Sequence, residues 1–112
     1  MARGQEAHRG RLKGVPPKPL QFHPAAVFEA GAAFQWYQER SDEAARAFLA
    51  ELDRAIAQIE EAPGRWPSYL DEIRRFVLRR FPYAVVYREG EEVVRVIAVT
   101  HARRRPGYWQ GR

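Results

Sequence analysis

The sequence predicts one α+β domain, in which a short N-terminal strand and an antiparallel helical hairpin precede a three-stranded antiparallel meander. Apolar residues recur at helical spacing from about residue 25 to residue 62. From residue 74 to residue 100 they occur in short runs typical of strands. Pro63-Gly64 and Pro82 separate these segments. The chain has 112 residues, which leaves room for one domain.

The N-terminal half of this domain is expected to be one strand followed by two helices. Leu20–His23 alternates apolar and polar residues, as a short strand does. Pro24 suits the first position of a helix, and a helix is expected over Ala25–Arg40. Its stripe expected to face the core consists of Phe28, Ala32 and Trp36, with Ala33 and Tyr37 beside it.

The second helix is expected to begin after Ser41 and to run to about Ala62. Ser41 is a plausible N-cap, and acidic residues follow it where the helix dipole favours negative charge. The connection between the helices is short, so they should pack as an antiparallel hairpin. The apolar face of this helix contains Ala45, Phe48, Leu52, Ala55, Ile56 and Ile59.

Three strands are expected after a linker at Arg65–Glu72. They cover Arg74–Phe81, Tyr83–Arg88 and Glu92–Thr100. The last of these has apolar residues on both faces, which indicates a central strand covered by helices on at least one side. Tyr83 and Tyr87 are expected to pack across the strands.

The composition excludes several classes of function. The chain has no cysteine, which rules out disulfides, thiolate metal sites and a cysteine nucleophile. It has no run of 18 apolar residues and no secretory signal, so a cytoplasmic protein that does not enter membranes is expected. The three histidines lack metal-ligand spacing, and no phosphate-binding glycine loop or nucleophile elbow is present. Neither a metal nor a cofactor is expected.

Charge is distributed very unevenly along the chain. Residues 1–18 carry a net +4, residues 19–72 carry −6 and residues 73–112 carry +7. This asymmetry indicates a polyanionic or acidic partner. Residues 19–112 contain arginine but no lysine, so no lysine in the domain can act as a general base.

Residues 1–19 are expected to be a disordered, basic, Pro-rich tail, and residues 20–112 the folded domain. An alternative for the tail is an electrostatic arm that contacts nucleic acid.

Five pieces of the chain, in the same order and spacing, resemble the RelE/ParE toxins of bacterial type II toxin–antitoxin systems. The resemblance covers residues 20–109. The pieces are Phe22-His23-Pro24, Trp36 to Arg40, Ala62 to Pro67, Arg79 to Arg88, and His101 to Trp109.

The resemblance implies the same fold, a β-α-α-β-β-β order with the helical hairpin on one face of the sheet. It implies a toxin that inhibits growth until a cognate antitoxin, whose flexible segment wraps the toxin, neutralises it. It also implies one of two activities. ParE-like members poison DNA gyrase without known catalysis, whereas RelE-like members enter the ribosomal A site and cut messenger RNA.

The residues expected to carry either activity lie mainly near the C-terminus. As a metal-independent endoribonuclease, the chain would use His101 as base or acid, Tyr108 as acid or stacking platform, and Arg103 at the phosphate. The lysines that some RelE-like members use have no counterpart here, which favours the ParE-like activity. The residues expected to bind the target or nucleic acid are Arg79, Arg88, Arg103, Arg104 and Arg105.

Structural roles compete with several of these assignments. His101 could satisfy backbone groups at the end of its strand, and Trp109 is expected to pack on the sheet and fix the terminus. Three adjacent like charges at Arg103–Arg105 repel one another unless a partner neutralises them, so this run is expected to be an interaction surface. A third possibility for the whole chain is an inert member that still binds an antitoxin.

Overall fold

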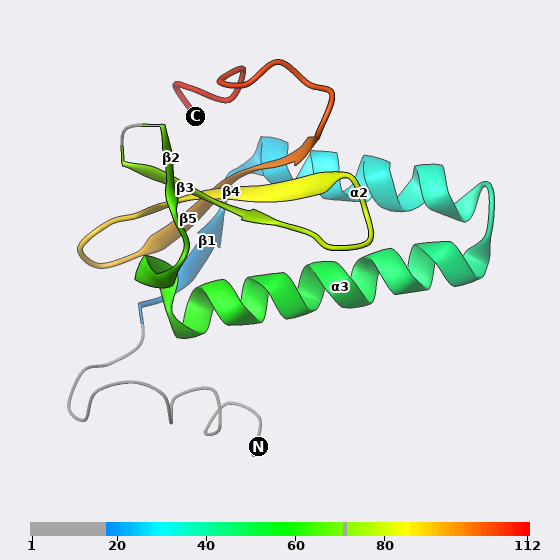
Figure 1. Ribbon diagram of the computed structural model, residues 1–112, viewed down its shortest axis with the longest axis horizontal. Helices are drawn as coiled ribbons and strands as arrows, with labels where there is room; N and C mark the ends of the chain where they lie inside the picture. The colour runs from blue at the N-terminus through cyan, green and yellow to red at the C-terminus, as the bar shows by residue number, and fades with distance from the viewer. Residues whose placement is uncertain (1–17, 71) are drawn as a thin grey trace.

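The computed structural model describes residues 18–70 and 72–112, in which a helical hairpin packs on one face of a five-stranded sheet (Figure 1). The order of the strands across the sheet is β1-β5-β4-β3-β2. Along the chain the elements are β1 (Leu20–Phe22), α2 (Pro24–Gln38), α3 (Asp42–Glu61), the 3-10 turn η1 (Pro63–Arg65), β2 (Ser68–Leu70), β3 (Ile73–Val77), β4 (Tyr83–Glu89) and β5 (Val94–His101).

The meander and the central strand are confirmed. Strands β3, β4 and β5 pair antiparallel in sequence order, and β1 adds to the free side of β5 in parallel. The parallel pairing joins Leu20 to Val94 and Phe22 to Val96, so β5 has a neighbour on each side. Its two faces are both buried, Val94 and Val96 in the cluster with the helices and Ile97 and Ala98 in the cluster with Trp109, which explains why β5 is apolar on both faces.

The segment Arg65–Glu72 was expected to be a linker and instead contributes the edge strand β2. Ser68 pairs with Arg74 and Leu70 with Ile73, and the register shifts between them. A strand of three residues is too short to give a readable alternation of apolar and polar side chains.

The first strand of the meander ends at Val77, four residues earlier than expected. The backbone N–H groups of Arg79 and Arg80 donate to the Glu51 carboxylate on α3 instead of continuing the ladder. Glu51 is buried, so α3 holds the turn between β3 and β4 in place.

The main core lies between the helices and the sheet. Phe48, Leu52 and Ile59 of α3 pack against Val85 and Tyr87 of β4, which confirms the apolar face predicted for this helix and the packing role of Tyr87. The Tyr87 hydroxyl is buried and donates a hydrogen bond to the Pro63 carbonyl, which joins the sheet to the end of the hairpin.

The expected core stripe of α2 is wrong. Phe28 is 75% exposed and Trp36 is 50% exposed, and Ala32 is also exposed. The buried residues of the helix are Ala26 and Ala33. The two residues expected beside the stripe do face the core, since Ala33 is buried and the Tyr37 ring stacks on Phe48. The small side chains of Ala26 and Ala33 allow close packing on this side of α2.

The described part of the chain begins in contact with the domain. The Lys18 ammonium lies 2.9 Å from Glu89 Oε2 and donates to the Gly90 carbonyl at 2.8 Å. The expectations for residues 1–17 lie outside the described residues.

Candidate target-binding surface

The chain turns sharply where β5 ends, and His101 shapes this turn. His101 Nδ1 accepts a hydrogen bond from the Arg103 backbone N–H at 3.0 Å, and the Arg104 N–H donates to the His101 carbonyl at 3.0 Å. The imidazole also packs edge-on against Tyr83, with ring centroids 5.0 Å apart. The structural role weighed for His101 is therefore present in the fold.

This hydrogen bond restricts what His101 can do in proton transfer. An Nδ1 that accepts from a backbone N–H carries no proton, so the proton of the neutral ring is on Nε2. With Nδ1 engaged by the backbone and the proton on Nε2, the ring has no free lone pair with which to accept a proton. The imidazole can donate a hydrogen bond to a ligand, but it is poorly arranged as a general base.

Tyr108 is also engaged inside the fold. Its hydroxyl donates to Glu29 Oε2 at 2.8 Å, and the Arg112 guanidinium lies 3.1 Å from the same carboxylate oxygen. Burial raises the pKa of the Tyr108 hydroxyl, and the Glu29 carboxylate acts in the same direction. We call Glu29, Tyr108 and Arg112 the C-terminal clip.

The C-terminal clip covers the part of the β5 edge that β1 does not pair with. Beyond Val96, the backbone of β5 has no β1 neighbour. Glu29 Oε1 accepts from the Val99 N–H at 3.0 Å, and Arg112 donates to the Ile97 carbonyl at 3.1 Å. Side chains from α2 and the C-terminal segment thus satisfy backbone groups that an added strand would otherwise pair with.

Trp109 fixes the same segment to the sheet face opposite α3. Its side chain is 1% exposed and packs in a second buried cluster with Ile73, Val86, Ile97 and Ala98. Figure 1 shows the C-terminal segment on the side of the sheet away from α3. The expected packing of Trp109 on the sheet is confirmed.

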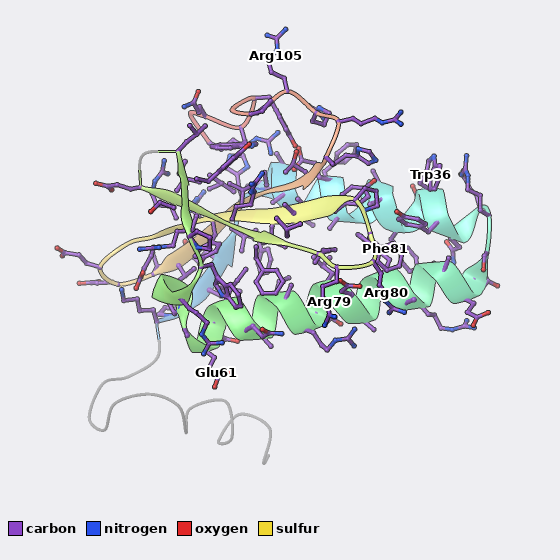
Figure 2. The ribbon with its side chains drawn as sticks, viewed as in Figure 1. Trp36, Glu61, Arg79, Arg80, Phe81 and Arg105 are labelled. Atoms are coloured by element: carbon purple, nitrogen blue, oxygen red, sulfur yellow. The ribbon has the colours of Figure 1, made fainter. Side chains whose placement is uncertain are left out.

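Between these anchors the three arginines of the run Arg103–Arg105 are exposed. The Arg104 guanidinium stacks 3.8 Å from the centroid of the Tyr108 ring, and Arg105 projects away from the sheet (Figure 2). No carboxylate of residues 18–70 or 72–112 forms an ion pair with any of the three. The fold therefore presents a dense positive charge on a segment held at both ends.

The structure brings only some of the other predicted residues to this end of the molecule. Arg79 lies in the β3–β4 turn, near the end of the sheet where Tyr83 pairs with His101. Its side chain is on the α3 side, where it lines a cavity of about 360 Å³ with Arg54 and Arg80 (Figure 2). Arg88 pairs with Ile73 and Arg95 at the opposite end of β4, so it is not part of one surface with Arg103–Arg105.

A smaller cavity of about 240 Å³ lies beside the arginine run on the face that carries Trp109. Arg75, His101 and Arg104 are among the polar side chains that line it, and the Tyr69 ring also lines it. The Arg75 guanidinium stacks 3.9 Å from the centroid of the Tyr69 ring. Arg75 was not among the predicted site residues. It is adjacent to Arg74 in the same strand, and the sequence alone does not indicate which of the two lines a cavity.

Glu29 and Arg112 were also missed. Glu29 is the only charged residue in α2, and a single charge on an otherwise apolar helix is the signal that could have revealed it. Arg112 carries no comparable signal, since its partner Glu29 is distant in the sequence and becomes a neighbour only in the folded domain.

Within the described ranges, no three acidic, histidine or cysteine side chains are grouped so that they could bind a metal ion. No helix of the described residues combines the length and the apolar character needed to cross a membrane.

Comparison with known proteins agrees with this architecture. A family model described as the ParE toxin of type II toxin–antitoxin system, parDE, matches residues 20–106. Toxin ParE2 of Mycobacterium tuberculosis, in strains CDC 1551 / Oshkosh and ATCC 25618 / H37Rv, is 27% identical over 88 residues, which are 78% of this chain and 84% of the relative.

A solved structure of the chromosomal ParDE toxin–antitoxin system from P. aeruginosa has the same fold. Its TM-score is 0.66 with 15% sequence identity, and the match covers 75% of this chain and 95% of that one. Because the family model spans most of the sequence, the chain belongs to the ParE toxin family and is the toxin component of a type II toxin–antitoxin system, whose partner is a cognate antitoxin.

Proposed function

We propose that this toxin inhibits growth by binding DNA gyrase through the exposed run Arg103–Arg105, without catalysing a reaction. The observation that supports it best is that these three arginines stand between two anchored points, the His101 turn and the Tyr108–Trp109 packing. Holding the run in place lowers the conformational entropy lost on binding. A cluster of unneutralised guanidinium groups also favours a partner with acidic side chains or bound nucleic acid.

The hydrogen bonds of His101 and Tyr108, the two residues predicted to transfer protons, also support a non-catalytic function. His101 Nδ1 accepts from the Arg103 N–H, and the Tyr108 hydroxyl donates to Glu29. Both groups are therefore engaged in hydrogen bonds within the fold, whereas RNA cleavage requires a free base and a free acid.

A second candidate, a RelE-like endoribonuclease, is favoured by one observation. The cavity of about 240 Å³ places Arg75, Arg104 and His101 around one space, with the Tyr69 ring beside it. Guanidinium groups bind phosphate oxygens and an aromatic ring stacks on a base, so this cavity has the chemistry to hold a nucleotide.

Pulse-labelling of DNA and protein synthesis in bacteria within minutes of induction separates the two candidates. We expect DNA synthesis to fail first, and purified chain to inhibit supercoiling by purified gyrase. Loss of protein synthesis first, with cleaved messenger RNA, would instead establish the nuclease. No growth defect at all would leave an inert member that binds its antitoxin only.

Substitutions identify the residues responsible. Arg103→Ala, Arg104→Ala and Arg105→Ala together should abolish gyrase inhibition, while the matched pair Arg88→Ala and Arg95→Ala at the far end of the sheet should not. His101→Asn keeps an acceptor for the Arg103 N–H but removes the imidazole, and Tyr108→Phe keeps the ring. Both should remain toxic. Loss of toxicity in these two variants with normal folding would overturn the non-catalytic proposal.

A further inference from the structure

A second group of arginines surrounds the cavity of about 360 Å³ between α3 and the β3–β4 turn. Arg54 of α3 lines it together with Arg79 and Arg80, which lie in the turn beside this helix (Figure 2). Glu51 is the only acidic residue among the described side chains that line the cavity, so three arginines and one glutamate give it a net charge of +2. Positive charge gathered around one cavity favours an anionic ligand.

Glu51 fixes the position of the turn and neutralises only part of this charge. Its side chain is 9% exposed, and it accepts hydrogen bonds from the backbone N–H groups of Arg79 and Arg80. Arg80 Nε donates to the second carboxylate oxygen at 3.4 Å, which leaves the two terminal amino groups of this guanidinium free to bind a ligand. The cavity is therefore built on a buried carboxylate that holds two of its arginines in place.

The other two guanidinium groups have no partner in the described part of the chain. Neither Arg54 nor Arg79 donates a side-chain hydrogen bond or forms an ion pair with residues 18–70 or 72–112. Like charges around one space repel each other, and an anion placed between them removes this cost. A guanidinium group presents its N–H donors in a planar fork that fits the oxygens of a phosphate.

The cavity also has an apolar part. Ala55 is 1% exposed and Phe76 is half-buried, whereas all three arginines are exposed, so the apolar groups lie deeper than the charged ones. The volume falls within the range of about 300–1,000 Å³ that is usual for small-molecule sites. An aromatic ring offers a flat surface against which a nucleobase can pack. The lining therefore fits a ligand that joins a flat ring to a phosphate.

We propose that this cavity binds a mononucleotide, with the phosphate held by Arg54, Arg79 and Arg80 and the base against Phe76. The site includes no residue of the run Arg103–Arg105, so it is separate from the surface assigned to gyrase. A bound nucleotide joins α3 to the β3–β4 turn and strengthens the contact that Glu51 already makes between them.

Two other anionic ligands fit the cavity less well. Outside it, α3 carries five acidic residues and one arginine, namely Asp42, Glu43, Asp53, Glu60, Glu61 and Arg46. A long nucleic acid lying along this helix therefore meets repulsion, which a compact ligand avoids. A single carboxylate of a peptide carries one negative charge, whereas a phosphate monoester carries about −1.5 to −2 and matches the net charge of the cavity.

Thermal unfolding of the full chain, produced by cell-free synthesis, tests the proposal in about 0.15 M salt, which screens distant charges. At least one of AMP, CMP, GMP and UMP should raise the unfolding temperature in a saturable way. The corresponding uncharged nucleoside should have no effect, and inorganic phosphate should act only at higher concentration. No shift with any of the four at millimolar concentration would overturn the proposal. An equal effect of inorganic phosphate would also overturn it, because the base would then contribute nothing.

A matched pair of variants locates the ligand. Arg54→Gln removes one guanidinium from an exposed position and should raise the dissociation constant of the nucleotide at least about tenfold. Arg46→Gln, also exposed on α3 but outside the cavity, should bind as the unmodified chain. Titrations followed by the NMR signals of the Arg79 and Arg80 amides measure both. Equal losses in the two variants would show that only net charge matters and would overturn the site.

Competition separates a nucleotide site from a nucleic-acid surface. A short DNA duplex that displaces the nucleotide at a lower concentration of phosphate than the nucleotide itself requires would overturn the proposal. So would loss of nucleotide binding when Arg103, Arg104 and Arg105 are all replaced by alanine. Arg54→Gln should still inhibit gyrase, so failure of this proposal and failure of the proposed function are distinguishable.

Discussion

Tyr87 joins the sheet to the end of the helical hairpin through one buried hydrogen bond. Its hydroxyl donates to the Pro63 carbonyl, and the side chain is fully buried. Tyr87→Phe leaves that carbonyl without a donor, so we expect the free energy of unfolding to fall by about 1–3 kcal/mol. Urea denaturation at neutral pH measures the loss. An unchanged midpoint would mean that the Pro63 carbonyl finds another donor.

The same residue predicts a loss of stability at high pH. Burial raises the pKa of Tyr87 to about 12 from an ordinary value of 10.0. The unfolded chain therefore loses this proton first, and the stabilisation present below pH 10 declines as the pH rises towards 12. We expect the loss attributable to Tyr87 to approach about 2–3 kcal/mol at the upper end of that window. The stability difference between the unmodified chain and Tyr87→Phe should shrink over the same window, and a constant difference would contradict this reading.

The environment of Glu51 predicts a loss of stability at low pH. Burial raises the pKa of its carboxyl, but hydrogen bonds from the backbone of Arg79 and Arg80, aided by the Arg80 side chain, outweigh burial and lower it. A lowered pKa contributes stability that is present above the pKa of the unfolded state, about 4.5, and is lost as the pH falls through the folded value.

We therefore expect Glu51→Gln to lower the free energy of unfolding at pH 7 by about 1–3 kcal/mol and to flatten its decline in acid. Urea denaturation at a series of pH values tests this. Glu60→Gln on the same helix is the control, and an equal effect of the two changes would show that only the net charge matters.

At the scale of the elements, α2 contains a residue that the isolated domain would be more stable without. Gly31→Ala adds a methyl group in open space, so the monomer should gain about 0.5–1 kcal/mol from helix propensity. Thermal unfolding should show the higher midpoint. A lower midpoint would indicate a contact at Gly31 within the chain.

The helices and strands differ in how well the sequence predicts them. The face of α3 from Ala45 to Ile59 was predicted correctly because apolar residues recur on one side and polar residues cover the other. Helix α2 is apolar nearly all round, so periodicity gives no unique inner face. Its orientation is decided by Ala26 and Ala33 packing on β5, which is a tertiary contact.

At the scale of the whole molecule, the sheet has a core on each face, and Trp109 is the largest side chain of the second one. Its ring packs on Ile73, Val86, Ile97 and Ala98. The centroids of the Trp109 and Tyr69 rings are 6.0 Å apart. Trp109→Ala should cost about 3–5 kcal/mol and should release the arginine run from its anchor. Denaturant unfolding measures the first effect, and hydrogen exchange of residues 102–112 the second. Val77→Ala, at an exposed position, should change little.

The candidate site could be predicted only in part. Charge clustering predicted that Arg103–Arg105 is an interaction surface; the three side chains are exposed, and that role stays a prediction. His101 and Tyr108 were assigned to chemistry without knowledge of their partners. Those partners are the Arg103 N–H and Glu29, and the second is 79 positions away in the sequence. Contacts of that range depend on the pairing of β1 with β5 and on the packing of α2, which no local pattern encodes.

The parallel pairing of β1 with β5 also affects when the toxin becomes functional during its own synthesis. The two strands are made several seconds apart at usual rates of translation, and β1 has no neighbour in the sheet until β5 emerges from the ribosome. A chain released early, before Val94, therefore holds a helical hairpin and an incomplete sheet without the arginine run. On the proposed role of the arginine run, premature termination should then yield harmless fragments, so that a transcript truncated by damage does not poison the cell that carries it.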